Sequence, residues 1–125
     1  MVEAEELIKR GEELYAQQKF HEAKDVFQEA HYLSESVYAL YMLAYSHSAI
    51  ALECIESKDY DEWDTYAAGA VYLFEWLLTE DITDEMRQKS SGTLAEIKTL
   101  QESVKQMKAS IEQRLKEFAD TDYTE

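Results

Sequence analysis

Residues 4–37 carry apolar and small side chains at the spacing of two short amphipathic helices joined by a tight turn. The positions that set this pattern are Leu7, Gly11, Leu14, Phe20, Ala23, Phe27 and Ala30. A helix pair of this size cannot bury its apolar face alone, so further helices must stack on it. Stacked hairpins leave an extended surface that is suited to holding another polypeptide. The stretch therefore favours a binding function over catalysis.

The scarcity of turn-forming residues extends this interpretation to the rest of the chain. Of its 125 residues 46 % are hydrophobic, none is proline, and glycine occurs only three times. Such a composition favours helices joined by short polar turns over a sheet of many short strands. We therefore expect an all-α fold. The apolar periodicity predicts helices over residues 3–17, 20–33, 36–56, 60–79 and 83–119.

The predicted helices divide the chain into three parts. Residues 1–82 form two antiparallel helical hairpins, residues 83–119 a long C-terminal capping or coiled-coil helix, and residues 120–125 a frayed acidic tail. The sequence Ser90-Ser91-Gly92 offers a place for a break in the long helix, but the apolar spacing continues through it and favours one helix. Part of that spacing forms a candidate seam for a homodimer: Leu100, Val104, Met107 and Ile111.

The first hairpin resembles the tetratricopeptide repeat family. The resemblance rests on Leu7-x-x-Arg10-Gly11-x-x-Leu14, followed by Phe20-x-x-Ala23-x-x-x-Phe27-x-x-Ala30. Arg10 stands where leucine is usual, and Glu35 where proline usually closes the repeat. A second, degenerate unit covers about residues 38–79, with Trp63 in an alanine position and a preceding helix about six residues too long. The three-helix MIT-type domain, which has similar first-hairpin sequences, is the alternative fold.

Charge limits the class of partner. The net charge is −15, and residues 38–82 hold nine acidic residues and one basic residue. A field of this sign repels phosphate backbones, so we expect no nucleic-acid partner. It favours a basic or amphipathic protein segment, although solubility alone is an equally good explanation of the charge.

The sequence also predicts a cytoplasmic location. Cys54 is the only cysteine, so no intrachain disulfide can form. The N-terminus lacks the basic and apolar regions of a signal peptide. No apolar run approaches the roughly 20 residues that a membrane crossing needs.

No motif predicts catalysis, a cofactor or a metal. The chain has no phosphate-binding glycine loop, no paired CxxC and no HExxH. His47 and Cys54 share a helix face, but they lie two turns, or about 10 Å, apart along it, which is too far to share a metal without a third ligand. We therefore expect a non-enzymatic protein without cofactors.

The best candidate for partner binding is the row Tyr38, Tyr41 and Tyr45, because tyrosine combines a large contact area with one polar tip. The alternative is that these rings pack against the neighbouring helices. The resemblance places Glu12 on the same groove face, where chaperone-binding repeats have lysine or asparagine, so a carboxylate clamp is not supported.

The sequence therefore predicts a non-catalytic protein-interaction module, an adaptor or chaperone-like protein, that binds a peptide or helix in an acidic, tyrosine-lined groove. The alternative is an assembly protein that homo-oligomerises through its C-terminal helix. A helical enzyme or regulator with a small-molecule pocket is the third and weakest reading.

Overall fold

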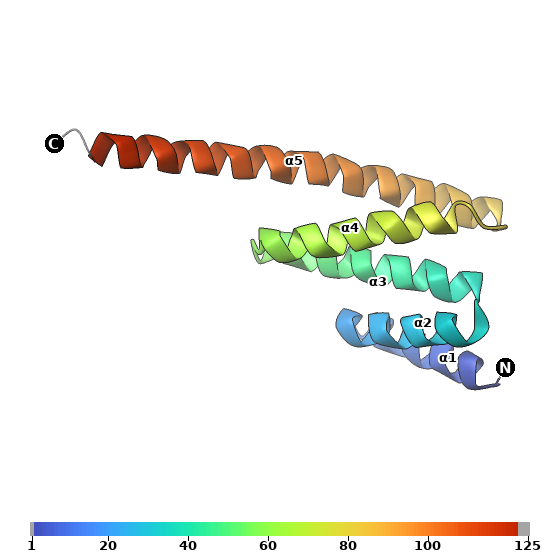
Figure 1. Cartoon of the computed structure of the whole chain (residues 1–125). Coiled ribbons are helices and arrows are strands. Elements are labelled where there is room, and N and C mark those ends of the chain that lie inside the picture. The colour runs from blue at the N-terminus through green and yellow to red at the C-terminus, as the bar shows by residue number, and fades with distance from the viewer. Residues whose placement is uncertain (1, 123–125) are drawn as a thin grey trace.

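The computed structural model describes residues 2–122, and within these residues it contains five α-helices and no strand (Figure 1). The helices are α1 (Val2–Ala16), α2 (Phe20–Ser34), α3 (Val37–Glu56), α4 (Tyr60–Leu77) and α5 (Asp84–Asp122). The prediction of an all-α fold with a long C-terminal helix is confirmed, and every predicted helix boundary lies within three residues of the observed one.

Side-chain caps explain where two of the helices begin. The hydroxyl of Ser36 accepts a hydrogen bond from the backbone N–H of Ala39 at 3.2 Å. The carboxylate of Asp59 accepts one from the backbone N–H of Glu62, also at 3.2 Å. Each cap satisfies a donor that the first helical turn would otherwise leave unpaired.

The turns within the two hairpins have the same geometry. Gln18 and Lys58 both adopt the left-handed conformation with φ of 62°. The residue after each of them donates a 2.9 Å backbone hydrogen bond to a carbonyl in the preceding helix, from Lys19 to Leu14 and from Asp59 to Cys54. The same turn therefore recurs 40 residues apart. Membership of the tetratricopeptide family stays a prediction.

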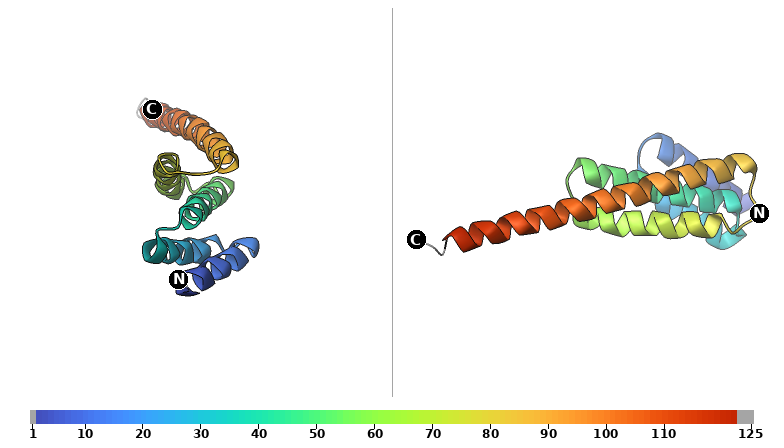
Figure 2. Two further views of the ribbon diagram at one scale, coloured as in Figure 1. Left: turned by 90° about the vertical axis from the view of Figure 1, so that its right-hand side faces the viewer. Right: turned by 90° about the horizontal axis from the view of Figure 1, so that it is seen from above.

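The helices stack in sequence order, and seen end-on the chain zigzags between two layers (Figures 1 and 2). One layer holds α1, α3 and the first half of α5, and the other holds α2 and α4. Alanines let the helices approach closely, as with the fully buried Ala23, Ala30, Ala67 and Ala70. The largest fully buried side chains between them are Trp63, Phe27 and Phe74.

Gly11 marks the closest approach of α1 and α2. A Cβ atom at this position would lie 2.7 Å from two ring carbons of Phe27, which is itself fully buried. The close packing of α2 therefore leaves no room for a larger side chain at this position. Gly92, in α5, has no atom within 4 Å of such a Cβ.

These two glycines give a matched pair of substitutions. We expect Gly11→Ala to destabilise the chain by up to about 2 kcal/mol, because overpacking costs about 1–3 kcal/mol and the helix-propensity gain offsets only about 1 kcal/mol of this cost. Gly92→Ala should instead stabilise it by roughly 0.5–1 kcal/mol. Urea unfolding followed by circular dichroism measures both. Equal stabilisation by the two substitutions would contradict the close packing of α1 on α2.

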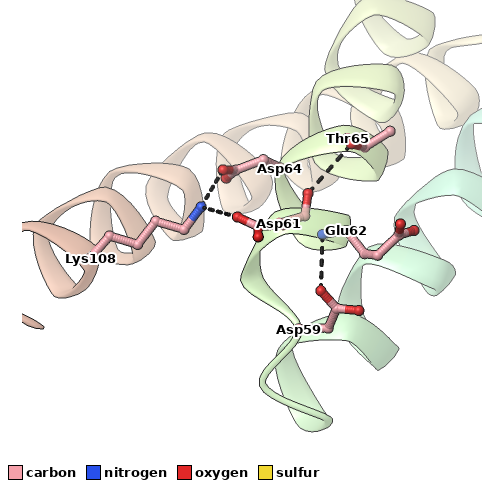
Figure 3. A network of polar contacts seen from close by, with 6 residues as sticks. All are labelled: Asp59, Asp61, Glu62, Asp64, Thr65 and Lys108. Carbon is pink, nitrogen blue, oxygen red and sulfur yellow. Dashed lines mark hydrogen bonds and ion pairs between the residues drawn. The ribbon is translucent and has the colours of Figure 1, made fainter.

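Helix α5 is continuous, without a break at Gly92. Its first half packs on α4 through Leu94, Ile97 and Val104, which are all buried. Further along, the ammonium of Lys108 donates hydrogen bonds to the carboxylates of Asp61 and Asp64 at the start of α4 (Figure 3). Beyond this contact the helix projects past the turn between α3 and α4 (Figure 1).

The predicted acidic tail falls at the end of this helix. Residues 120–122 continue α5, and residues 123–125 lie outside the described residues. Over the part of the chain that the structure describes, none of the helices combines the length and apolar character that a membrane crossing requires.

Candidate functional site

The predicted tyrosine row lies along α3 between α1 and α5. The Tyr38 hydroxyl donates a 2.8 Å hydrogen bond to the carboxylate of Glu12 in α1. Burial and this hydrogen bond raise the pKa of Tyr38 to about 12. The structure thus brings Glu12 and the first tyrosine together at the surface, as the sequence placed them.

The other two tyrosines take part in packing between helices. The Tyr45 hydroxyl contacts Thr93 Oγ1 at 2.9 Å and donates to the backbone carbonyl of Lys89 at 3.1 Å, both in α5. Its ring packs edge-on against Phe74 with 5.0 Å between ring centroids, and the centroid of the Tyr41 ring lies 4.8 Å from that of Tyr45. The hydroxyl of Tyr45 is therefore used within the chain, and a partner-binding role for the row stays a prediction.

The structure divides the predicted dimer seam into two pairs. Val104 is 4 % exposed and belongs to the core with α4, and Leu100 packs against the same cluster. Met107 and Ile111 lie further along α5 and are exposed. The two exposed residues continue into Leu115 and Phe118, so an apolar stripe that can face a partner begins at Met107. A homodimer through these residues stays a prediction.

A groove of about 1160 Å³ opens on the opposite layer, between α2 and α4. Residues of α3 form its floor, namely Leu43 and His47, and Leu73 of α4 adds a further apolar side chain. We call this the α2–α4 groove. It exists because α2 and α4 each pack on α3 and leave a space between themselves.

Three aromatic side chains line the α2–α4 groove. Tyr32 of α2 is 84 % exposed and Tyr72 of α4 is 68 % exposed. Trp76 packs edge-on against His31 across the groove, with 5.1 Å between ring centroids, and its indole N–H donates to the carboxylate of Glu80 at 3.1 Å. Large exposed aromatic side chains around an apolar floor are typical of protein-binding surfaces.

Charge in the groove is of one sign. Its lining residues include the four carboxylates of Asp25, Glu29, Glu35 and Glu80 and no lysine or arginine. Lys24, outside the lining, pairs with Asp25 at 3.1 Å. The other three acids form no ion pair in the described residues. The groove therefore attracts positive charge.

His47 lies at the floor of the groove against Gly69. Its Nδ1 has no hydrogen-bond partner among the described residues, and a Cβ on Gly69 would lie 2.7 Å from that atom. Burial, with a smaller contribution from the positive charge of Lys24, lowers the pKa of His47 to about 4. The imidazole is therefore neutral at neutral pH and acts as part of the packed floor.

The sequence analysis did not predict this groove. Tyr72 and Trp76 lie four residues apart on α4 and off its core-facing side, and Tyr32 lies off the core-facing side of α2. Large aromatic residues at helical spacing on a solvent-facing side were therefore the available signal. The sequence does not show that these aromatic side chains line one groove, because this depends on the distance between α2 and α4 when both pack on α3.

Two further searches, for a metal site and for related proteins, find nothing that bears on the groove. In residues 2–122, no three histidine, cysteine, aspartate or glutamate side chains gather closely enough to hold a metal ion. Comparison with models of protein families, with curated proteins and with solved structures finds no match to this chain.

Proposed function

We propose that this chain is a non-catalytic protein-interaction module that holds a basic, amphipathic helix in the α2–α4 groove. The observation that carries the proposal is the composition of the groove, in which four carboxylates and three exposed aromatic side chains surround an apolar floor. An amphipathic helix would place its apolar side chains on this floor and its lysines and arginines against the acidic rim.

The contribution of each part follows from general binding energetics. Aromatic side chains such as Tyr72 and Trp76 supply large contact area with little loss of conformational freedom. The carboxylates at the rim mainly speed association and select against acidic partners. The tyrosine row, with Tyr38 and Glu12 at the surface, is a second and smaller surface for the same kind of partner.

A synthetic peptide tests this function. The probe is a fluorescently labelled amphipathic helix with leucine and phenylalanine on one side and lysine and arginine on the other. We expect it to bind the chain, and we expect the affinity to fall as salt screens the charges. The same peptide with glutamate in place of every lysine and arginine should not bind. Fluorescence anisotropy measures both.

Charge reversal at the groove provides the matched variant. Glu29→Lys with Glu35→Lys should weaken binding of the basic peptide about tenfold or more, equivalent to about 1.4 kcal/mol. Glu13→Lys with Glu96→Lys changes the net charge equally at exposed positions outside the groove and should have a much smaller effect. Equal weakening by both pairs would show that the peptide senses only overall charge and would refute the groove as the binding site.

A further inference from the structure

Trp76 is held in the α2–α4 groove by three contacts, and part of its side chain stays open. His31 of α2 packs against the indole with 5.1 Å between ring centroids and an angle of 84° between the ring planes. Tyr72, one turn earlier on α4, lies 6.4 Å away at an angle of 63°. The indole N–H donates to the carboxylate of Glu80 at 3.1 Å. Trp76 is nevertheless 39 % exposed, so a partner meets an aromatic surface whose orientation is already fixed.

The indole and the carboxylate beside it form a combination that attracts a cation. The face of an aromatic ring carries partial negative charge, and tryptophan is the strongest of the side chains that bind cations in this way. Because the indole N–H of Trp76 bonds to Oε1 of Glu80, the carboxylate is held at the edge of the same ring. Within residues 2–122 this carboxylate forms no ion pair. Ring and carboxylate therefore attract a positive group to one place in the groove.

The chain joins a ring, a carboxylate and a cation once already, between the first halves of α2 and α4. There the ammonium of Lys24 lies 5.9 Å from the centroid of the Tyr66 ring and 3.1 Å from the carboxylate of Asp25. Toward the other end of the same two helices, Trp76 and Glu80 again place a ring beside a carboxylate, but the residues that line the groove include no lysine or arginine. A lysine or arginine at this end therefore comes from a partner.

Arg87 of α5 approaches Glu80 but binds backbone atoms. Its guanidinium donates hydrogen bonds to the carbonyl oxygens of Leu78 at 3.0 Å and of Glu80 at 3.3 Å. These bonds tie α5 to the segment after α4, and Arg87 is not among the residues that line the groove. The side chain of Glu80 lines the groove and stays available to a partner.

Arginine suits this place better than the other cationic groups. A guanidinium is planar and weakly hydrated, so it can stack on the indole while its N–H groups donate to a carboxylate at the edge of the ring. The ammonium of lysine is a strongly hydrated point charge without a flat face. A quaternary ammonium would lie on the ring equally well, but it has no N–H group to donate to Glu80.

We propose that Trp76 and Glu80 determine the specificity of the α2–α4 groove by anchoring one arginine side chain of the bound helix. The guanidinium stacks on the indole of Trp76, and the carboxylate of Glu80 accepts its hydrogen bonds. The ring of Tyr72 flanks the same place. The inference rests on the proposed function, since it names the residue by which the basic helix is recognised. Tryptophan and arginine are also the side chains that most often dominate the energy of protein interfaces.

Two versions of the labelled amphipathic peptide test the anchor by fluorescence anisotropy. Every cationic position is arginine in one and lysine in the other, so charge and apolar side chains are the same. We expect the unmodified chain to bind the arginine peptide about threefold or more tightly than the lysine peptide. Trp76→Leu should bring the ratio of the two Kd values close to one. Phe118→Leu removes an exposed aromatic ring outside the groove and should leave the ratio unchanged.

Glu80→Gln tests the second half of the anchor. Glutamine keeps an oxygen that can accept the hydrogen bond from the Trp76 indole, but it removes the negative charge. The variant should weaken binding of the arginine peptide about threefold or more and weaken the lysine peptide less. Glu13→Gln removes the same charge at an exposed position outside the groove and should affect both peptides little and equally.

The outcomes separate this inference from the proposed function. Equal affinity of the unmodified chain for the two peptides would keep the groove function and overturn the arginine anchor. A preference for arginine that survives in Trp76→Leu would overturn the assignment of the anchor to this ring. Binding of neither peptide would overturn both proposals. Because each variant is judged by the ratio of two affinities, a general loss of stability in Trp76→Leu does not imitate the expected result.

Discussion

Replacement of Trp63 by alanine should cost about 3–5 kcal/mol of stability, the largest single loss that we expect in this chain. The Trp63 side chain is fully buried in the core. It occupies the position in the second hairpin that Ala23 occupies in the first, because the two hairpin turns lie 40 residues apart. The ring therefore fills space that a small side chain would leave empty. Since domains of this size are stable by only about 5–15 kcal/mol, Trp63→Ala should unfold at a much lower urea concentration.

Trp63→Phe is the matched control. The indole Nε1 of Trp63 has no hydrogen-bond partner among the described residues, and an unpaired buried N–H costs about 1–3 kcal/mol. Phenylalanine keeps much of the ring contact and removes this cost, so the loss should be no more than about 1.5 kcal/mol. Urea unfolding followed by far-UV circular dichroism compares the two variants. If both lose the same small amount of stability, the side chain does not fill the core in the way that the structure shows.

The helices of this chain could be predicted closely because their signals are local. Apolar spacing located each helix, and the start of α4 is fixed by the equally local hydrogen bond from the backbone N–H of Glu62 to the carboxylate of Asp59. The continuity of α5 through Gly92 followed from spacing as well. Thr93, the residue after Gly92, makes a 2.9 Å hydrogen bond with the Tyr45 hydroxyl. Such a contact between residues 48 positions apart has no counterpart in local sequence.

The candidate site was harder to predict because α3 is apolar on two sides. Periodicity shows that Tyr45 and His47 lie on different sides of α3, but it does not show which side faces which neighbour. In the structure Tyr45 packs toward α5, whereas His47 lies at the floor of the α2–α4 groove. The sequence therefore predicted an acidic, tyrosine-lined groove along α3, whereas the structure has a groove with acidic and exposed aromatic side chains on the opposite layer of helices. The side of α3 that faces each neighbouring helix is set by contacts between residues far apart in the chain, and apolar periodicity within one helix does not reveal these contacts.

Acidification should destabilise the chain through His47. Burial lowers the pKa of this imidazole from 6.5 to about 4, so between these values the unfolded chain binds a proton that the folded chain does not. The free energy of unfolding should therefore be unaffected by His47 above about pH 6.5 and should fall as the pH decreases toward 4. The expected loss is up to about 3 kcal/mol, since one pKa unit corresponds to about 1.36 kcal/mol.

His47→Gln separates this effect from the titration of the many carboxylates. Glutamine is neutral at every pH, so the variant should lose less stability than the unmodified chain between about pH 6.5 and pH 4.5. Urea unfolding at several pH values gives the free energy of unfolding of each chain, and the difference between the two curves measures the contribution of His47. Parallel curves would mean that the imidazole protonates as easily in the folded chain as in the unfolded one. The His47 imidazole would then be open to water, and the floor of the α2–α4 groove would be less closely packed around it than the structure shows.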